Sequence, residues 1–598
     1  MSLKTLLVSH GTCCQAAGAG QVYIALKSEI ARWNLEDKVE LKKPGCHGFS
    51  QIDPVVVIEP DGILYARVQE ADASKIIQSL LPGGQKPDHF YYVDPHTSRK
   101  IPYRQEIPFF SKQKRLILKN CGTMDPDNID DYLKVGGYEA LVRVVSELTP
   151  NEVITEIKDS GLRGLGGGGF TTGEKWEICA RAPGSIKYVI CNADEGDPGS
   201  FQDRSVLEGD PHAVIEGLLI TAYAVGAAEG YIYVRSEYPF AIKKLQIALH
   251  QARQRGFLGR NILGSDFSFD AEIFQGAGAF VCGEETALIQ SLQGERGIPY
   301  PRPPYPVVSG LHGQPTLINN VKTLANIRWI INNGAAWFTT TGTKQSKGSA
   351  IFSLSGNVVN CGLVEVPMGT TLREIIFGIG GGIPGGKAFK AVQTGGPSGG
   401  CLPADLLDTA VDFDTLRDAG SIMGSGGMVV MDEDTCMVDT ARYFLNFNLK
   451  ELCGQCVPCR LGTRQMLEIL KRITCGDGKH SDLDLLLQLG ETVTKGSLCG
   501  LGKTVPNPVL TTLRYFRDEY EAHIHDKRCP ARACKDLINY RIDGQQCKGC
   551  SLCLKACPVG AIKGGKKQEH FIEQKRCIRC GTCLEVCSDH FGAIQCIS

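Results

Sequence analysis

The sequence predicts a multidomain α/β protein that ends in metal-binding, cysteine-rich segments. The chain has 598 residues, which is enough for three to five domains. Glycine-rich segments with carboxylates and carboxamides occur between residues 160 and 327, and 16 of the 26 cysteines lie in tight groups beyond residue 450. Because no secretion signal is evident, grouped cysteines indicate metal ligands rather than a disulfide framework.

The composition excludes several classes of function. Lys and Arg number 64 and Asp and Glu number 65, so a formal charge of -1 gives no basic field for nucleic acid or anionic lipid. No stretch of about 18 uninterrupted apolar residues could span a bilayer. The first residues, MSLKTLLVSHGTCC, contain too short an apolar run for a signal peptide. We therefore expect a soluble, cytoplasmic protein that binds neither nucleic acid nor membrane.

Residues 528–598 contain one cysteine pattern twice, after a short hinge. CKGCSLCLKACPVGAI and CIRCGTCLEVCSDHFGAI both have C-x2-C-x2-C-x3-C spacing. In this spacing three thiolates bind one iron–sulfur cube and the fourth binds the other cube. The predicted ligand sets are Cys547, Cys550, Cys553 and Cys587 for one 4Fe-4S cluster, and Cys577, Cys580, Cys583 and Cys557 for the second. A zinc double knuckle is the alternative. The segment from about residue 540 resembles a bacterial two-cluster ferredoxin domain.

Residues 433–527 predict a helical bundle with a third 4Fe-4S cluster. Cys453, Cys456 and Cys459 have C-x2-C-x2-C spacing, and Cys499 in a glycine-flanked loop is the best candidate for the fourth ligand. LGTRQMLEILKRI and HSDLDLLLQLGETV place apolar residues at helical intervals, so helices would bring the loops together. A zinc site with the same four ligands remains an alternative.

The hinge before the repeated pattern predicts a zinc site. EYEAHIHDKRCPARACKDL contains two histidines and two cysteines, which could supply most of a tetrahedral set. The candidate ligands are Cys475, His523 or His525, Cys529 and Cys534. Surface cysteines without metal are the alternative.

Residues 101–340 contain the glycine-rich segments. SGLRGLGGGGFTTGEKW (160–176) lets the backbone approach a phosphate without a Cβ clash, and Lys175 adds a cationic point charge. Alone, this loop could simply be flexible. CNADEGDPGSFQDR (191–204), GAGAFVCGEETALIQSLQGERG (276–297) and LINNVKTLANI (317–327) place carboxylates and carboxamides among glycines, as a bound polar ring system requires.

Together these segments resemble the flavoprotein subunit of respiratory complex I and the NADH-oxidising subunits of bacterial NAD-linked hydrogenases and formate dehydrogenases. The resemblance runs from FFSKQKRLILKNCGTMDP to about residue 525 and implies a Rossmann-like domain that binds FMN and NADH. The FMN contacts that it implies are Gly164, Gly166, Gly167, Lys175, Asn192, Asp194, Asn319, Asn320 and Thr323. The dinucleotide contacts that it implies are Phe170, Glu195, Asp197, Gly283, Glu284, Glu285 and Arg302. A solvated helix cap is the alternative for the glutamates. Leu165 and Thr171 depart from the complex I pattern, in which arginine and proline are usual.

The two remaining domains also rest on resemblance. Residues 341–432, with VEVPMGTTLREIIF and KAVQTGGPSGGCLP, resemble the β-grasp domain of the same family. Residues 1–100, with VSHGTCCQAAGAG and PGCHGFSQIDPVVVI, resemble the thioredoxin-like 2Fe-2S domain of bifurcating-hydrogenase flavoprotein subunits, with an alternating strand after the second motif.

The expected ligand positions of that N-terminal domain hold Ser9, Cys14, Cys46 and Ser50, so only two thiolates remain. Serine replaces cysteine poorly because iron favours the softer, more acidic thiolate. Cys13 could substitute at one position. We expect the domain to keep its fold without a stable cluster.

The resemblance implies that FMN exchanges hydride with NAD(H) and single electrons with three 4Fe-4S clusters, so no catalytic side chain is expected. It further implies a ferredoxin- and NAD-dependent electron-bifurcating complex of the hydrogenase, formate dehydrogenase or transhydrogenase type. The partners would be ferredoxin, a small 2Fe-2S thioredoxin-like subunit and a catalytic subunit. Two alternatives remain: a flavoprotein subunit of an NADH:quinone oxidoreductase, and a flavin-free scaffold that only conducts electrons.

Overall fold

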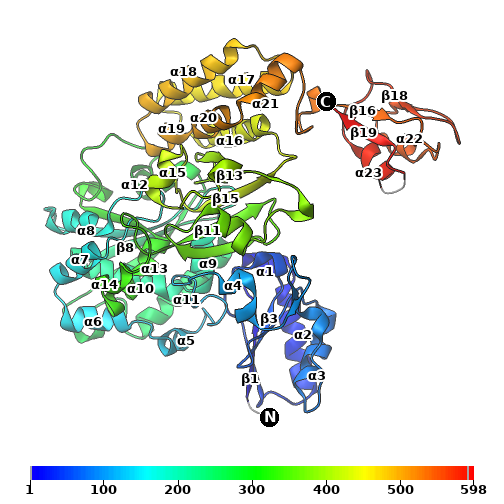
Figure 1. Ribbon diagram of the computed structural model, residues 1–598. Helices are drawn as coiled ribbons and strands as arrows, with labels where there is room; N and C mark the ends of the chain where they lie inside the picture. Colours follow the sequence, from blue (N-terminus) through cyan, green and yellow to red (C-terminus); the bar gives the residue numbers. More distant parts are fainter. Residues whose placement is uncertain (1–2, 589–590) are drawn as a thin grey trace. The chain divides into compact units, whose positions relative to one another are not determined.

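The computed structural model describes residues 3–588 and 591–598. The chain forms two compact units, one of residues 1–430 with 498–500 and one of residues 431–497 with 501–598. Their elements are labelled along the chain in Figure 1.

The N-terminal sheet has the strand order β2-β1-β3-β4. Its strands are β1 (Lys4–Val8), β2 (Val39–Lys42), β3 (Val56–Glu59) and β4 (Ile63–Tyr65). β1 pairs parallel with β2 and antiparallel with β3. Helices α1 (Thr12–Ala16), α2 (Ala19–Arg32) and α3 (Ala73–Leu80) complete this part. The strand predicted after the second motif is β3, but its predicted alternation is wrong. Val56, Val57 and Ile58 are all buried, so both faces of β3 are covered.

The central sheet is wholly parallel and has the order β10-β7-β8-β9. Its strands are β7 (Tyr188–Ala193), β8 (Glu229–Arg235), β9 (Asp270–Gly276) and β10 (Thr316–Asn320). The surrounding helices are α4 (Pro108–Ser111), α5 (Ile129–Lys134), α6 (Glu139–Glu147), α7 (Pro150–Asp159), α8 (Thr172–Arg181), α9 (Gln202–Gly209), α10 (Pro211–Val225), α11 (Pro239–Gln254), α12 (Glu285–Leu292), α13 (Val321–Asn333) and α14 (Ala335–Phe338). The sheet and α10 are largely buried, as expected for a parallel sheet covered by helices.

A five-stranded mixed sheet follows, in the order β12-β11-β15-β13-β14. Its strands are β11 (Ser349–Gly356), β12 (Gly362–Pro367), β13 (Phe389–Thr394), β14 (Gly400–Pro403) and β15 (Gly427–Asp432), with α15 (Phe413–Asp418) before the last strand. β11 pairs antiparallel with β12 and parallel with β15. The β-grasp assignment of this sheet stays a prediction.

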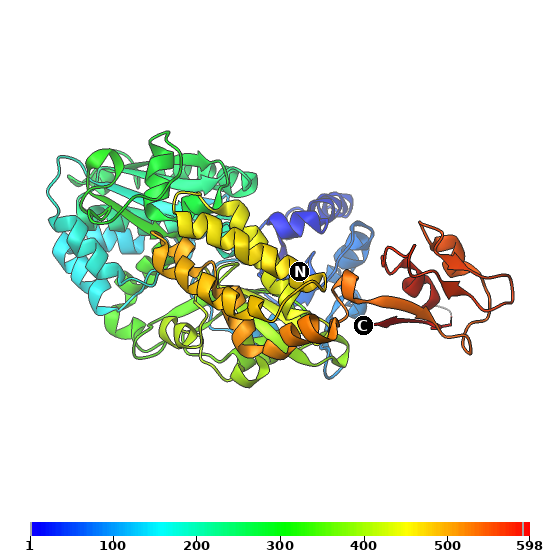
Figure 2. The same ribbon diagram turned by 90° about the horizontal axis from the view of Figure 1, so that it is seen from above.

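The second unit begins with a helical bundle, whose helices lie side by side in Figure 2. They are α16 (Met437–Glu451), α17 (Thr463–Thr474), α18 (Ser481–Gly496), α19 (Gly500–Thr504), α20 (Asn507–Tyr515) and α21 (Arg517–Glu521). The two helices predicted from periodicity are confirmed as α17 and α18. α17 buries Met466, Leu470 and Ile473 on one face, in keeping with its predicted amphipathic pattern.

The C-terminal segment contains two short β-ladders and two helices that repeat. β16 (Asn539–Ile542) pairs antiparallel with β19 (Ile594–Ile597), and β17 (Ile562–Lys563) pairs with β18 (Phe571–Ile572). Helices α22 (Leu552–Ala556) and α23 (Thr582–Ser588) each contain the third cysteine of one triplet, Cys553 and Cys583.

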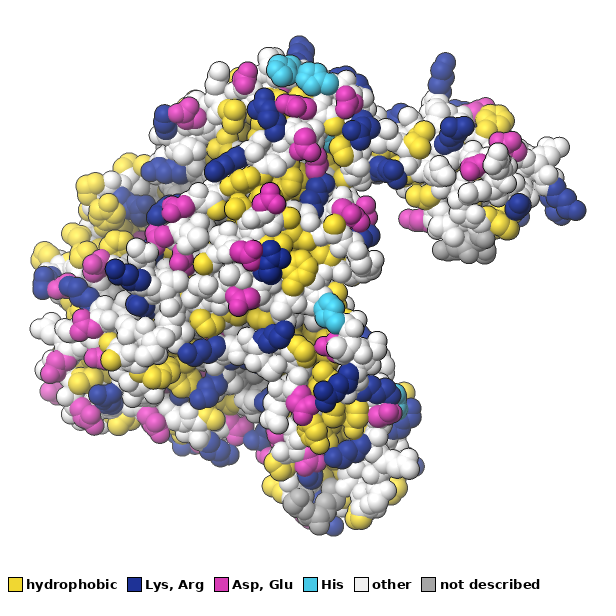
Figure 3. Space-filling model, viewed as in Figure 1, with side chains coloured by type: hydrophobic (Ala, Val, Ile, Leu, Met, Phe, Trp, Pro, Cys, Tyr) yellow, Lys and Arg dark blue, Asp and Glu magenta, His cyan; other side chains and the backbone are white. Residues whose placement is uncertain are grey.

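The surface agrees with the balanced composition. Lys and Arg side chains are interspersed with Asp and Glu over the face in Figure 3, so that face carries no field of one sign. Among the described residues, no helix is both long and apolar enough to cross a membrane.

Candidate functional sites

The central sheet creates a binding edge where its strand order reverses. The chain runs outward from β7 to β8 and β9 and then returns to place β10 on the other side of β7. Asn320 of β10 lies opposite Asn192 of β7 in the parallel register, and Asn319 lies opposite Cys191. In open parallel sheets, ligands bind at the carboxyl ends of the strands at such a reversal. The three predicted asparagines therefore meet at the expected edge.

The glycine-rich loop lies against this edge. A Cβ on Gly166 would approach the Asn320 Cβ to 3.0 Å, and Gly167 has a φ of +119°, which only glycine adopts readily. A Cβ on Gly168 would meet open space. The Leu165 amide donates to the Thr323 hydroxyl at 2.9 Å, which ties the loop to α13.

The departure from the complex I pattern at Leu165 places an apolar side chain inside the protein. The Leu165 side chain is buried, so it lines no open surface of the loop. The loop backbone keeps its glycine geometry beside Leu165, with Gly167 at a φ of +119°.

Lys175, on the first turns of α8, reaches two acceptors. Its ammonium pairs with the Glu285 carboxylate and donates to the Ile318 carbonyl at 2.7 Å. Next to it, the Trp176 indole donates to the Asn319 side chain at 3.0 Å. Lys175, which was predicted to bind a phosphate, therefore lies near the carboxyl end of β10. The predicted ligand residues Glu285 and Asn319 lie beside it.

Glu284 is the N-cap of α12, which was the alternative weighed for the glutamates. Its carboxylate accepts the amides of Thr286 at 2.9 Å and Ala287 at 3.0 Å. Arg302 lies 4.0 Å from the same carboxylate. Gly283 accepts a hydrogen bond from the Asn192 side chain at 2.8 Å, so this segment also joins the edge.

Phe170 is the exposed aromatic side chain of the glycine-rich loop. It is 56% exposed, although its carbonyl accepts the Gly164 amide at 2.8 Å. A rigid loop therefore holds an uncovered apolar ring, which suits stacking against a planar ligand.

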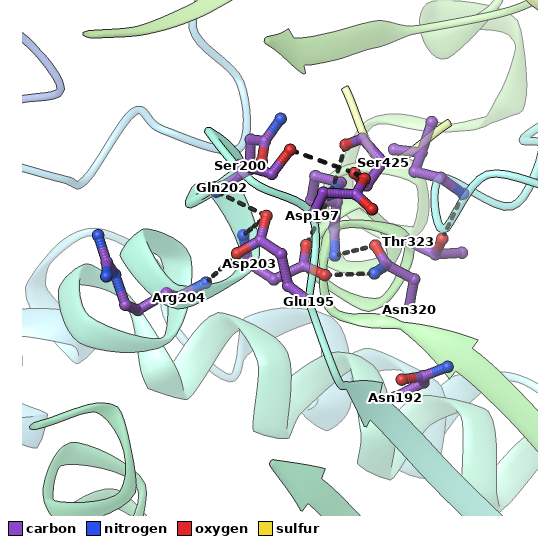
Figure 4. A network of polar contacts seen from close by, with 12 residues as sticks. Asn192, Glu195, Asp197, Ser200, Gln202, Asp203, Arg204, Asn320, Thr323 and Ser425 are labelled. Atoms are coloured by element: carbon purple, nitrogen blue, oxygen red, sulfur yellow. Dashed lines mark hydrogen bonds and ion pairs between the residues drawn. The ribbon is translucent and has the colours of Figure 1, made fainter. Parts of the chain in front are cut away.

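A buried ionic network lies beside the strand ends (Figure 4). Asp203 accepts from Lys322 at 2.7 Å and from the Asn320 side chain at 2.6 Å, and the side chains of Lys322 and Asp203 are 2% and 3% exposed. Lys322 also donates to the Ser425 carbonyl at 3.0 Å. The network thus orients Asn320 from behind the site.

Glu195 and Asp197 are buried in the same network rather than exposed at a ligand surface. Glu195 accepts the amides of Gln202 at 2.8 Å, Asp203 at 3.1 Å and Arg204 at 3.2 Å, so it caps the first turn of α9. Burial, and then the Asp203 charge, raise the pKa of Glu195 to about 7. Burial raises the pKa of Asp197 to about 6, although Asp197 accepts a hydrogen bond from the Ser425 hydroxyl.

Asp194, the remaining predicted residue of this segment, is also buried. Its carboxylate lies 3.7 Å from the Arg235 guanidinium, and its backbone amide donates to the Asn192 side chain at 3.1 Å. Arg235 extends from the end of β8, so a third strand end contributes to the edge.

The residues at this edge fit an FMN. Loop amides beside glycine, a lysine among acceptors, and carboxamides at two strand ends provide the donor types that a phosphate, a ribityl chain and a flavin ring require. The structure therefore brings together the residues that resemblance assigned to FMN. Of those assigned to the dinucleotide, Phe170, Gly283, Glu284 and Glu285 lie at accessible positions, whereas Glu195 and Asp197 stand behind them.

The C-terminal segment groups its cysteines in the predicted crossover sets. A cavity is lined by Cys557, Cys577, Cys580 and Cys583 together with the apolar side chains of Ile562 and Ile572. These four cysteines are one predicted set, and Cys557 comes from the first repeat. Apolar walls of this kind shield an iron–sulfur cube from water.

The second predicted set is grouped around Cys553. Burial, and then the neighbouring Cys550, Cys587 and Cys547, raise the pKa of Cys553 to about 11. Cys587, which comes from the second repeat, is therefore close enough to the first triplet to act on the pKa of Cys553. The two sets fit two metal clusters in the arrangement that the spacing predicts.

The triplet of the helical bundle lies where α16 gives way to the next helical turn. Cys453 and Cys456 are partly exposed, whereas Cys459 is buried within residues 458–462. Cys499 is also buried, but residues 498–500 cluster with the other compact unit. The assignment of Cys499 as fourth ligand stays a prediction.

Four buried residues form a tetrahedral group at the hinge: Cys436, His523, Cys529 and Cys534. The Cys436 sulfur lies 3.7 Å from that of Cys534 and 3.5 Å from His523 Nε2. Zn–S bonds of about 2.3 Å at tetrahedral angles separate two sulfurs by about 3.8 Å, so the spacing fits one zinc ion. His523 Nδ1 donates to the Glu519 carbonyl at 2.7 Å, which turns Nε2 toward the thiols.

The prediction of Cys475 as a zinc ligand is wrong. Cys475 is exposed at the end of α17, where burial and then Asp536 raise its pKa, and Cys436 occupies the fourth position instead. The choice between two histidines is also decided by the geometry. His525 hydrogen-bonds to His480 at 3.2 Å and lies outside the group, whereas His523 is fully buried within it.

Comparison with known proteins agrees with these sites. Residues 157–329 match the family model of the Nuo51 FMN-binding domain, residues 439–523 match the NADH-ubiquinone oxidoreductase-F iron-sulfur binding region, and residues 539–588 match a 4Fe-4S dicluster domain. The NADP-reducing hydrogenase subunit HndC of Solidesulfovibrio fructosivorans is 56% identical over 459 residues, which cover 77% of this chain and 93% of that protein. The chain belongs to this family of FMN-binding, iron–sulfur oxidoreductase subunits. The predicted family is thereby confirmed.

Two further relatives show the breadth of the family. An NADH-quinone oxidoreductase subunit of Rhizobium meliloti is 44% identical over 415 residues, which cover 69% of this chain and 99% of that protein. The crystal structure of an NAD+-reducing [NiFe]-hydrogenase in the H2-reduced state matches with a TM-score of 0.62 and 30% identity, covering 88% of this chain and 84% of that chain.

In this oxidoreductase subunit, sequence reasoning missed the residues behind the FMN edge. Asp203 and Lys322 both lie inside the motifs that the sequence analysis quoted, but their pairing joins positions 119 residues apart. Ser425 lies in a third segment. A charged residue two positions after a predicted ligand, as Lys322 stands after Asn320, was the available signal.

Proposed function

We propose that this subunit exchanges hydride with a nicotinamide dinucleotide through FMN and passes single electrons to three 4Fe-4S clusters. We further propose that it does so in a ferredoxin- and NAD-dependent electron-bifurcating complex. The observation that carries the proposal is the presence, in one chain, of a polar strand-end site beside a glycine-rich loop and of two cysteine sets in a C-terminal segment.

The chain's own residues bind and orient the reactants. Lys175 exchanges its Glu285 partner for a phosphate, while amides of the glycine-rich loop approach the same anion. Asn192 and Asn320 hold polar atoms of the flavin, and Asp203 keeps Asn320 in place. FMN, when bound, supplies the hydride chemistry and the change from two-electron to one-electron transfer.

The dinucleotide lies along the accessible residues in this proposal. Phe170 covers an aromatic ring, and the carboxylate released from Lys175 joins Glu284 at the border of the site. Arg302 sits beside Glu284 and could accept a 2′-phosphate. We favour NADH because the two glutamates would repel that phosphate, although a relative is named as NADP-reducing.

The cysteine sets are the ligands of the electron path. Two clusters are held by the crossover sets of the C-terminal segment, and a third is held by Cys453, Cys456, Cys459 and Cys499. The tail clusters exchange electrons with ferredoxin, and a catalytic subunit and a small 2Fe-2S subunit complete the complex. A structural zinc bound by Cys436, His523, Cys529 and Cys534 closes the hinge before the ferredoxin-like tail.

Membership of an NADH:quinone oxidoreductase is the second candidate function. The likeness to an NADH-quinone oxidoreductase subunit of Rhizobium meliloti favours it, although that match covers 69% of this chain, which also carries a 4Fe-4S dicluster domain at residues 539–588. A flavin-free scaffold is the third candidate, and flavin content alone separates it from the other two.

The test is anaerobic purification of the chain with quantified flavin and iron, followed by NADH titration under visible and EPR spectroscopy. We expect bleaching of one FMN and about twelve irons per chain, as three cubes require. Intact clusters without flavin would leave the scaffold function. In the purified complex, NAD reduction that neither needs nor gains from ferredoxin would contradict bifurcation and leave the quinone-type function.

A further inference from the structure

The N-terminal sheet carries a cluster of metal-ligating side chains apart from the FMN edge. Cys14 lies on α1, Cys46 lies on the loop after β2, and Asp53 lies just before β3. One ligand atom from each lies within 4.8 Å of the others. Cys14 and Cys46 are buried in the core of this part, and Asp53 is partly buried. Three separate segments thus converge on one point.

The spacing fits one metal ion. The Cys14 sulfur lies 3.5 Å from Asp53 Oδ2. A Zn–S bond of about 2.3 Å and a Zn–O bond of about 2.0–2.2 Å at the tetrahedral angle would separate these ligands by about 3.6 Å. The carboxylate is also held in place, because the Ser9 hydroxyl donates to Asp53 Oδ1 at 3.2 Å while accepting the Val55 amide at 3.2 Å.

The charge of this cluster calls for a cation. Among the described residues, no Lys, Arg or His side chain forms an ion pair with Asp53, whose side-chain partners are the Ser9 hydroxyl and the Cys14 thiol. A buried carboxylate beside two thiols is costly unless a positive charge compensates it. A divalent ion would supply that charge and would also be bound by the two thiolates.

A 2Fe-2S cluster, which a thioredoxin-like ferredoxin domain would hold, does not fit these residues. Two of the four expected positions are Ser9 and Ser50, and the Ser9 hydroxyl is committed to Asp53 and Val55. Asp53 lies outside the expected positions. Moreover, three donors that converge within one coordination sphere match a single ion better than a cluster whose ligands are divided between two irons.

We propose that Cys14, Cys46 and Asp53 bind one zinc-type divalent ion, with a water as the fourth ligand. The ion fixes α1, whose first residue contacts the FMN-binding part: the Thr12 amide donates to the Glu208 carboxylate at 2.8 Å. Glu208 belongs to α9, the same helix that Glu195 caps at its other end. The ion therefore helps to hold the N-terminal part against α9.

The experiment is metal analysis of the anaerobically purified full chain, with zinc, iron and flavin counted in the same samples. The variants are Cys14→Ser, Asp53→Asn, Cys436→Ser and, as a matched control, Cys13→Ser. Cys13 neighbours Cys14 on α1, but its sulfur faces the Arg204 guanidinium at 3.6 Å and it is no member of the group. We expect Cys14→Ser and Asp53→Asn each to lose one zinc equivalent at unchanged flavin, and Cys13→Ser to lose none.

A second measurement does not depend on the N-terminal variants folding. The Cys436→Ser variant removes the separate hinge group, so zinc-edge X-ray absorption of this variant should report two sulfur and two oxygen ligands. A zinc-free Cys436→Ser variant would overturn the proposal, as would zinc content unaffected by Cys14→Ser. Two extra irons lost with Cys14, or a Cys14–Cys46 disulfide found by mass spectrometry without reduction, would also overturn it.

Discussion

At the carboxyl ends of β7 and β10, buried charges are partnered by other protein groups, whereas in the C-terminal segment cysteine thiols from both repeats gather around one cavity. Asp203 is satisfied by Lys322 and Asn320 without any ligand. Cys557, Cys577 and Cys583, by contrast, line a cavity with apolar walls. The first region is preorganised for its ligand, and the second depends on its ligand for its own stability. Cofactor removal should therefore unfold the C-terminal segment but leave the region around the FMN edge folded.

The largest expected effect is loss of the C-terminal fold when its clusters are removed. Oxidative removal of iron with a chelator should make residues 539–598 sensitive to protease while residues 157–329 stay resistant. The segment has only short β-ladders and a small core that includes its cysteines, so metal binding supplies much of its folding free energy. Mass spectrometry of the fragments measures the cleavage sites.

Removal of FMN is the matched control for that comparison. It should leave both regions resistant, because the charges behind the flavin edge keep their partners. Equal protease resistance of residues 539–598 with and without iron would contradict the proposed dependence on metal.

The second-largest expected effect is the loss of zinc from the group of Cys436, His523, Cys529 and Cys534. Cys436→Ser should lose one zinc equivalent per chain and lower the melting temperature of the helical bundle, because Cys436 is one of four buried ligands. Cys475→Ser, which alters an exposed cysteine nearby, is the control and should change neither quantity. The opposite pattern, in which only Cys475→Ser releases zinc, would restore Cys475 as the ligand.

The third-largest expected effect tests whether the buried charges beside the FMN edge stabilise the domain by pairing with each other. Asp203→Asn leaves the buried Lys322 ammonium without its carboxylate and should destabilise the domain by about 3–5 kcal/mol. The midpoint of urea-induced flavin release, followed by fluorescence, measures this change. Arg373→Gln breaks the exposed ion pair with Asp408 and should shift the midpoint far less, because water screens this pair. Similar costs for both variants would mean that the buried pair contributes no more than a surface pair.

Local spacing explains how much the sequence could reveal. The repeated cysteine pattern predicted sets that cross between repeats. Cys557 of the first repeat lines one cavity with Cys577, Cys580 and Cys583 of the second, and the full ligand sets stay a prediction. Cys436 could not be found in this way, because it lies 87 residues before His523 and begins a helix of ordinary amphipathic pattern. Asp53 was not predicted as a metal ligand for a related reason. It lies outside the four ligand positions that the cysteine pattern defines in the N-terminal part.

Contacts between distant segments explain why two carboxylates were placed wrongly from the sequence. Glu195 and Asp197 were expected at the dinucleotide, since carboxylates among glycines are typical of a ligand surface. The fold instead turns Glu195 onto the amides of α9 and Asp197 onto Ser425, a residue from a distant segment. Composition and spacing carry no information about which of several neighbouring carboxylates is turned inward.

The smallest expected effect concerns the protonation of Glu195. Its pKa of about 7 lies above the ordinary value of 4.5, so the folded state retains a proton that the unfolded state loses between these values. The stability contributed by this proton is complete below about pH 4.5 and is lost as the pH rises through about 7. Glu195→Gln removes the titration, so the urea midpoint of flavin release should fall less between about pH 5 and pH 8 in the variant, by an amount on the order of 1–2 kcal/mol. An identical pH dependence in both proteins would mean that Glu195 is already ionised in the folded state. In that case the amides of α9 outweigh burial, and this carboxylate would be as fully satisfied as Asp203.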